Sequence, residues 1–91
     1  LIETYVHSTG KVGSMVMLLC ETDFVAKNEE FKTLAHEIAM QVAASDYESM
    51  DALLDDEYIK DGSKKTRDLI TEAIAKIGEK IELGKFVRFS V

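Results

Sequence analysis

The residue types that most often do chemistry in small proteins are few in this chain, and they lie far apart. The two histidines, His7 and His36, have no Cys or His at a spacing that suits a zinc site. Cys20 has no basic neighbour in sequence that would activate it, so we interpret it as a small core residue. The acidic run 55–57 lacks the glycine and the alternating oxygen ligands of a calcium loop. We therefore predict no metal site, no cofactor and no catalytic residue, and we do not expect an enzyme.

The junction between a predicted strand and a predicted helix contains an unusual pair, Asp23 and Phe24, within the stretch CETDFVAKNEEF. Such junctions are usually built from small polar capping residues. One interpretation is that Thr22 or Asp23 caps a short turn and Phe24 packs into the core. Burial is the default for phenylalanine, so the residues alone favour that interpretation. The alternative is that Phe24 is presented to a partner.

Two strands should precede this junction, over residues 1–8 and 12–20, joined by a hairpin turn at Gly10. Both faces of the second strand are apolar. Val16 and Leu18 lie on one face, and the other carries Met15, Met17 and Leu19. A sheet covered on one face would alternate apolar with polar residues. The second apolar face is therefore either ordinary core, the default interpretation, or an interface with another sheet.

Helices should follow the junction. Asn28 is a good N-cap for the first, whose apolar stripe comprises Phe31, Leu34, Ala35, Ile38, Ala39 and Val42, with Gln41 outside it. A short helix fits within 49–58. Ser63 is the predicted cap of the next helix, which Gly78 should end. Beyond that helix stop, we assign Glu79 and Lys80 no role.

The last segment, from Ile81 to Val91, has the pattern of a strand. Its alternation predicts one face made of Ile81, Leu83, Val87, Phe89 and Val91, and an opposite face made of Glu82, Arg88 and Ser90 together with Phe86. The element order is then β-β-α-α-β, with a further short helix between the two long ones. It predicts an α+β fold: a three-stranded antiparallel sheet with two to three helices packed on one face.

Composition limits the function classes. The chain has 91 residues, enough for one small domain. Eleven Lys and Arg against 17 Asp and Glu give a net charge of −6, which argues against nucleic-acid binding. The longest near-continuous apolar stretch, about nine residues, is too short to span a bilayer, so we expect no membrane partner. A single cysteine fits a reducing, cytoplasmic environment. Both ends fall within strand patterns, so we expect a part excised from a longer protein.

Several stretches together resemble one protein family. They are CETDFVAKNEEF followed by AHEIAMQVAAS, the hairpin YVHSTGKVG, and the ending LITEAIAKIGEKIELGKFVRF. Covering most of the chain, they resemble the elongation factor Ts family, the guanine nucleotide exchange factors of elongation factor Tu. The chain departs from the family pattern in having Leu19 where a polar Asn is usual before the cysteine. It also has a short region between its long helices.

The resemblance implies a role for the whole chain, 1–91, as a single core (dimerisation) subdomain. It implies that Thr22, Asp23, Phe24 and Val25 bind elongation factor Tu, and that this loop promotes GDP release by inserting near the magnesium and phosphates. Family subdomains occur in pairs, in one chain or as a homodimer, which suggests that Met15, Met17 and Leu19 form the interface. The alternative is a purely structural dimerisation module, with exchange carried by other domains.

Overall fold

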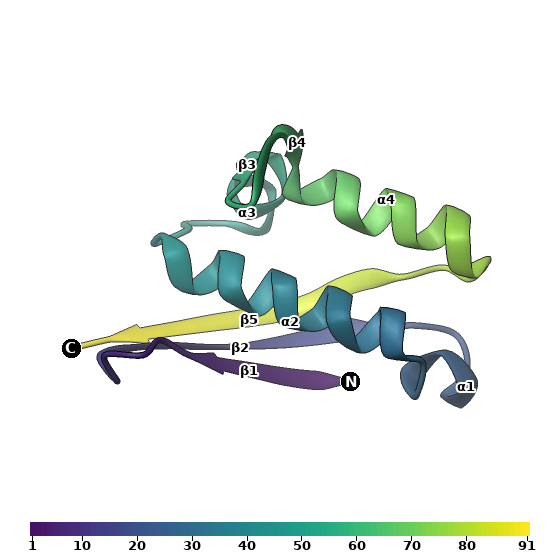
Figure 1. Cartoon of the computed structure of the whole chain (residues 1–91), viewed down its shortest axis with the longest axis horizontal. Helices are drawn as coiled ribbons and strands as arrows, with labels where there is room; N and C mark the ends of the chain where they lie inside the picture. The colour runs from purple at the N-terminus through teal and green to yellow at the C-terminus, as the bar shows by residue number, and fades with distance from the viewer.

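The computed structural model describes all residues, 1–91 (Figure 1). In chain order the elements are β1 (Ile2–Val6), β2 (Val12–Leu19), α1 (Asp23–Ala26), α2 (Glu29–Ala44), α3 (Met50–Asp55), β3 (Glu57–Tyr58), β4 (Asp61–Lys65), α4 (Thr66–Ile77) and β5 (Glu82–Ser90). The main sheet is antiparallel, in the order β1-β2-β5. The predicted α+β class and three-stranded sheet are confirmed. None of the helices has the length and apolar character needed to cross a membrane.

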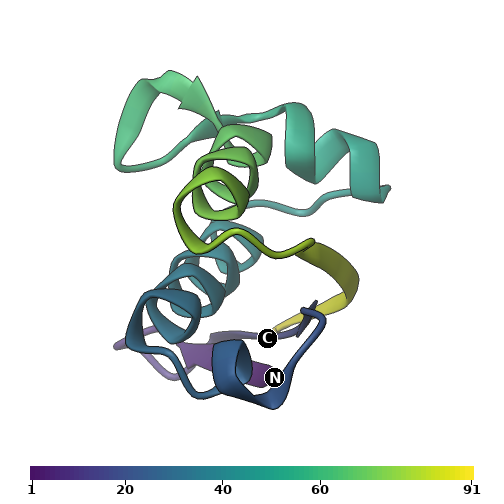
Figure 2. The same ribbon diagram turned by 90° about the vertical axis from the view of Figure 1, so that its right-hand side faces the viewer.

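Helix α2 is the element that covers the sheet, and α4 lies beyond it on the same side (Figure 2). The Oδ1 atom of Asn28 accepts a hydrogen bond from Glu30 N at 2.7 Å, which caps α2 as predicted. Every residue of the predicted stripe is buried. The central contacts are made with Val16 and Leu18, which β2 turns toward the helices. The three-and-four periodicity therefore located the core correctly.

The prediction that Gln41 lies outside the core is wrong, because Gln41 is fully buried. Its Nε2 atom donates to Tyr47 Oη at 2.8 Å and to the Glu57 carbonyl at 3.1 Å. Its Oε1 atom accepts from Ile59 N at 2.9 Å. The chain after α2 folds back over this side of the helix, and the amide can be buried there because both ends of it are hydrogen-bonded.

The predicted capping of α4 by Ser63 is also wrong. A short second hairpin, β3–β4, precedes α4, and Ser63 lies within it. Its hydroxyl donates to Asp61 Oδ1 at 2.6 Å, a local bond that competes with helix capping. The N-cap is instead Lys65, whose backbone N–H donates to Asp68 Oδ2 at 2.9 Å. At the other end, Gly78 ends the helix in a left-handed conformation, φ 84°, as predicted.

A bulge in β5 overturns the single apolar face predicted for that strand. Met17 pairs with Lys85 but Leu18 pairs with Leu83, so Gly84 is an extra residue. An extra residue inverts the alternation, because successive side chains point to opposite faces. Ile81 and Leu83 are buried toward the helices, whereas the exposed Val87 and Phe89 lie on the opposite face, and Val91 follows the strand and is exposed. Phe86 and Arg88 face the helices instead; Arg88 Nε donates to the Ala43 carbonyl at 3.1 Å.

Candidate functional site

The turn after β2 presents Phe24 to solvent. Thr22 is the N-cap of the one-turn helix α1, and its Oγ1 atom accepts from Val25 N at 3.4 Å. Val25 is 7% exposed and packs into the core, whereas Phe24 is 89% exposed. Neighbouring positions on a helical turn point in different directions, so burying Val25 turns Phe24 outward. The interpretation that Phe24 packs into the core is therefore wrong. Thr22 is the cap, rather than Asp23.

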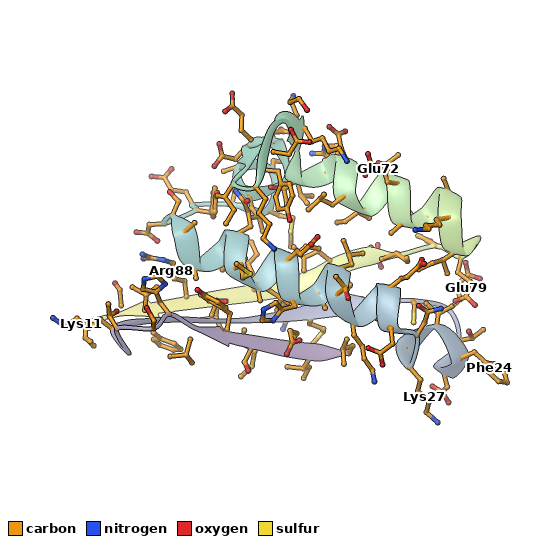
Figure 3. The ribbon with its side chains drawn as sticks, in the orientation of Figure 1. Lys11, Phe24, Lys27, Glu72, Glu79 and Arg88 are labelled. Carbon is orange, nitrogen blue, oxygen red and sulfur yellow. The ribbon has the colours of Figure 1, made fainter.

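The same turn is held from a distant part of the chain, the junction of α4 and β5. Glu79 Oε1 accepts from the backbone N–H of Glu21 and of Thr22, each at 3.1 Å, and Glu79 Oε2 accepts from the Thr22 hydroxyl at 2.6 Å. In return, Glu21 Oε1 accepts from Lys80 N at 2.7 Å. Figure 3 shows Glu79 and Phe24 at the same end of the molecule. These four bonds, which we call the Glu79 clasp, join segments that are 57 to 59 residues apart in sequence.

The sequence did not predict the Glu79 clasp, because each residue in it also has a simpler local interpretation. Gly78 accounts for the end of α4, and the residues after a helix stop need no further role. The only signal that includes Glu79 is the family resemblance, because the triplet IGE, residues 77–79, is part of the stretch quoted for it. The positive φ of Gly78 matters here, because it turns the chain sharply just before Glu79.

The four residues predicted to bind a partner lie together, but they differ in surface exposure. Asp23 and Phe24 are exposed, and the Asp23 carboxylate takes part in no side-chain hydrogen bond or ion pair. Thr22 is exposed, but its hydroxyl is occupied by Val25 N and Glu79. Val25 is buried. The turn therefore offers a free carboxylate and a free aromatic ring on a backbone that is held on both sides.

The face of the sheet away from the helices is apolar. Seven apolar residues dominate this outer sheet face, which they share with Thr4, Glu82 and Lys85: they are Ile2, Val6, Met15, Met17, Leu19, Val87 and Phe89. Met15 is 45% exposed and Phe89 is 73% exposed. A shallow hollow of about 220 Å³ lies among Ile2, Met15, Met17 and Val87. The β5 bulge enlarges this face, because it adds Val87 and Phe89 to the three residues expected from β2.

A tyrosine whose pKa is clearly shifted, Tyr47, lies outside the turn that carries Phe24. Burial raises the pKa of Tyr47 to about 12, and the hydrogen bond that its hydroxyl donates to Asp56 Oδ2, 2.6 Å long, acts in the same direction. Tyr47 also accepts from Gln41, so this perturbation belongs to the core side of α2. No group of three or more His, Cys, Asp or Glu side chains is placed to hold a metal ion.

Comparison with known proteins agrees with the resemblance. The chain matches, over residues 21–91, the family described as Elongation factor TS. It is 46% identical over 90 residues to an elongation factor Ts of Clostridium acetobutylicum, covering 99% of this chain and 29% of that protein. It is 40% identical over 91 residues to one of Nostoc, covering 100% of this chain and 28% of that protein.

An elongation factor Ts of Clostridium botulinum is 43% identical over 91 residues, covering 100% of this chain and 30% of that protein. The chain thus spans less than a third of the length of each of these three relatives. The match includes both halves of the Glu79 clasp, because it begins at Glu21 and runs past Lys80. The chain therefore belongs to the elongation factor Ts family.

Proposed function

We propose that this chain is the part of an elongation factor Ts protein that binds elongation factor Tu and promotes GDP release. Asp23 and Phe24 are the contacting pair, and they insert near the magnesium and phosphates of the bound nucleotide. Thr22 and Val25 anchor the pair, Thr22 through its capping bond and Val25 through burial. The observation that carries the proposal is the 89% exposure of Phe24 on a turn whose backbone is held in place.

The exposure of Phe24 does not stabilise the folded chain. A phenylalanine ring in water forgoes the stabilisation that burial of a large apolar side chain provides. The ring therefore contributes almost nothing to the stability of this chain, and it is available to fill a pocket of a partner. Aromatic side chains that fill a partner's pocket are typical centres of binding energy.

The mechanism requires differential affinity and no bond-making step. A GTPase holds GDP through magnesium and through the groups around its phosphates. An exchange factor must bind the nucleotide-free state more tightly than the GDP state, because only that difference shifts the equilibrium. An aromatic wedge that displaces the magnesium-binding elements achieves this without touching the base. By reciprocity, GDP must weaken binding of the exchange factor by the same factor.

A second candidate function, a purely structural dimerisation module, is favoured by the outer sheet face. Seven apolar residues on one open face form the kind of patch that marks a protein interface. Its proposed occupant is a second elongation factor Ts subdomain, in the same chain or in a homodimer. Pairing through the outer sheet face is compatible with a binding role of Phe24, because the two lie on different parts of the chain; the purely structural module differs in leaving exchange to other domains. The cytoplasmic location stays a prediction.

The test measures the affinity of the intact protein for elongation factor Tu in two states, nucleotide-free and loaded with GDP. We expect tighter binding to the nucleotide-free state, by a factor equal to that by which the protein weakens GDP binding. Labelled GDP should also leave elongation factor Tu faster when the protein is added. Phe24→Ala in the intact protein should lose most of both effects; if it changes neither, exchange is carried by other domains and this chain is left as the dimerisation module.

A further inference from the structure

We infer that Glu79 is a positioning residue for the turn that carries Phe24: its carboxylate, at the α4–β5 junction, holds that turn in the orientation in which Phe24 meets a partner. This inference rests on the proposed function, because it gives Glu79 an effect on binding through Phe24. The side chains of Glu79 and Phe24 lie at the same end of the molecule (Figure 3).

The bonds of Glu79 converge on the backbone directly before Asp23. Its two carboxylate oxygens accept three hydrogen bonds from two adjacent residues, Glu21 and Thr22. Several bonds to one carboxylate fix the orientation of the bound segment as well as its position. Thr22 is also the N-cap of α1. Whatever holds Thr22 therefore sets the direction in which α1 begins, and with it the direction of Phe24.

The geometry favours a local effect of Glu79 over a global one. All of its bonds lie at exposed positions, where water competes and the contribution to folding stability is small. The Glu21–Lys80 bond and the buried Val25 remain when Glu79 is removed. The turn should then loosen without unfolding the domain. A looser turn must lose more conformational entropy when Phe24 engages, so it binds less well.

The experiment uses the intact protein in four forms: wild type, Glu79→Ala, Glu79→Gln and Glu48→Ala. Glu79→Gln keeps an oxygen that can accept from both backbone N–H groups. Glu48 is an exposed carboxylate of the α2–α3 connection that makes no side-chain hydrogen bond, so it is the matched control. The readouts are amide hydrogen exchange without a partner, melting temperature, and GDP release from elongation factor Tu.

The informative amides are those of Ala26, Lys27 and Asn28. They close the turn through bonds to the carbonyls of Thr22, Asp23, Phe24 and Val25, and they do not touch Glu79. In Glu79→Ala we expect these amides to exchange about tenfold faster, because local opening becomes easier.

The melting temperature of Glu79→Ala should fall by less than about 4 °C. GDP release should slow by about tenfold, the cost of ordering roughly one extra residue on binding. Glu79→Gln should recover most of both effects, and Glu48→Ala should match wild type.

A double variant separates positioning from direct action. In a Phe24→Ala background, Glu79→Ala should slow GDP release by less than about twofold, because residues that act through one another are not additive. Leu53, in α3, is completely buried, so Leu53→Ala is the reference for loss of core packing. Three results would overturn the inference: unchanged exchange at residues 26–28, fully additive effects, or a melting temperature lowered as far as in Leu53→Ala. If Phe24→Ala alone leaves GDP release unchanged, the proposed function fails. Amide exchange then decides separately whether Glu79 holds the turn.

Discussion

Two phenylalanines that are close in sequence, Phe24 and Phe31, have opposite surroundings. Phe24 is 89% exposed on α1, whereas Phe31 is completely buried in the first turn of α2. Each belongs to a helix with a polar N-cap, Thr22 and Asn28 respectively. Counted from those caps, the third residue of each helix, Val25 or Phe31, is buried, whereas Phe24 is the second residue of its helix and points outward. The α2 stripe lies over Val16 and Leu18 of the sheet, while α1 lies at the end of the sheet (Figure 1).

The difference separates a residue that holds the fold, Phe31, from one that we propose serves a partner, Phe24. Phe31 contributes to folding because its whole surface is removed from water. Phe24 contributes almost nothing to folding, which agrees with the binding role that we propose for it. The turn around Phe24 is nevertheless well anchored, by the Glu79 clasp and by Val25. An exposed aromatic ring on an anchored backbone differs from an exposed ring on a mobile loop, because the backbone that carries it is already held in place before binding.

The largest effect on folding stability is expected when the ring of the buried Phe31 is removed. Phe31→Ala should lower the free energy of unfolding by about 3–5 kcal/mol, through lost apolar transfer and a cavity under α2. Urea denaturation followed by circular dichroism measures this change. The fraction that remains folded should still release GDP from elongation factor Tu. A loss below about 1 kcal/mol would mean that Phe31 is not the core residue its burial indicates.

Phe24→Ala should give the opposite pattern. We expect the free energy of unfolding to stay within about 0.5 kcal/mol of wild type, because the ring is exposed. The affinity for nucleotide-free elongation factor Tu should fall by about 2 kcal/mol or more, roughly thirtyfold. Ile59→Ala is the control, since Ile59 is 50% exposed and lies away from the turn. A Phe24→Ala protein that melts early but releases GDP normally would mean that the ring belongs to the core, and Phe24 would then not differ from Phe31.

The outer sheet face extends the comparison to apolar residues exposed on a strand. Met15→Glu should weaken self-association, or pairing with a second subdomain, by at least about tenfold, or 1.4 kcal/mol. The charge should leave folding nearly unchanged, because Met15 is 45% exposed. Sedimentation at micromolar concentration compares the variant with wild type. A wild-type protein that is monomeric, with this face open to water, would remove the interface from the proposal.

The smallest effect concerns the side of α2 where Tyr47 contacts the buried Gln41, and it is confined to alkaline pH. The pKa of Tyr47 is about 12 in the folded state, against 10.0 for an unperturbed tyrosine, so the native state keeps this proton to higher pH. The resulting stability is complete below pH 10 and is lost as the pH rises toward 12. Tyr47→Phe should flatten that decline, at a cost of about 1 kcal/mol at neutral pH for the lost hydrogen bonds. An equally steep decline in Tyr47→Phe would assign the loss to other groups.

Features that depend only on neighbours along the chain could be predicted from the amino-acid pattern. The hairpin of β1 and β2, the start of α2 at Asn28, its buried stripe and the stop at Gly78 all follow from periodicity and capping, which act within a few residues. The two-sided apolar character of β2 was also visible, since side chains alternate across a strand.

Which side of each element faces the core and which faces water depends on contacts between distant parts of the chain, and these appear only in the folded protein. One extra residue, Gly84, places the residues after it on the opposite face of β5 from the one that simple alternation predicts, because a bulge shifts the alternation by one residue. Gln41 became buried because the segment from Tyr47 to Ile59 returns over α2. Phe24 lies in water because α1 packs into the core through Val25 instead, and Glu79 holds its turn from more than fifty residues away. Such contacts join residues far apart in the chain, so no local pattern records them.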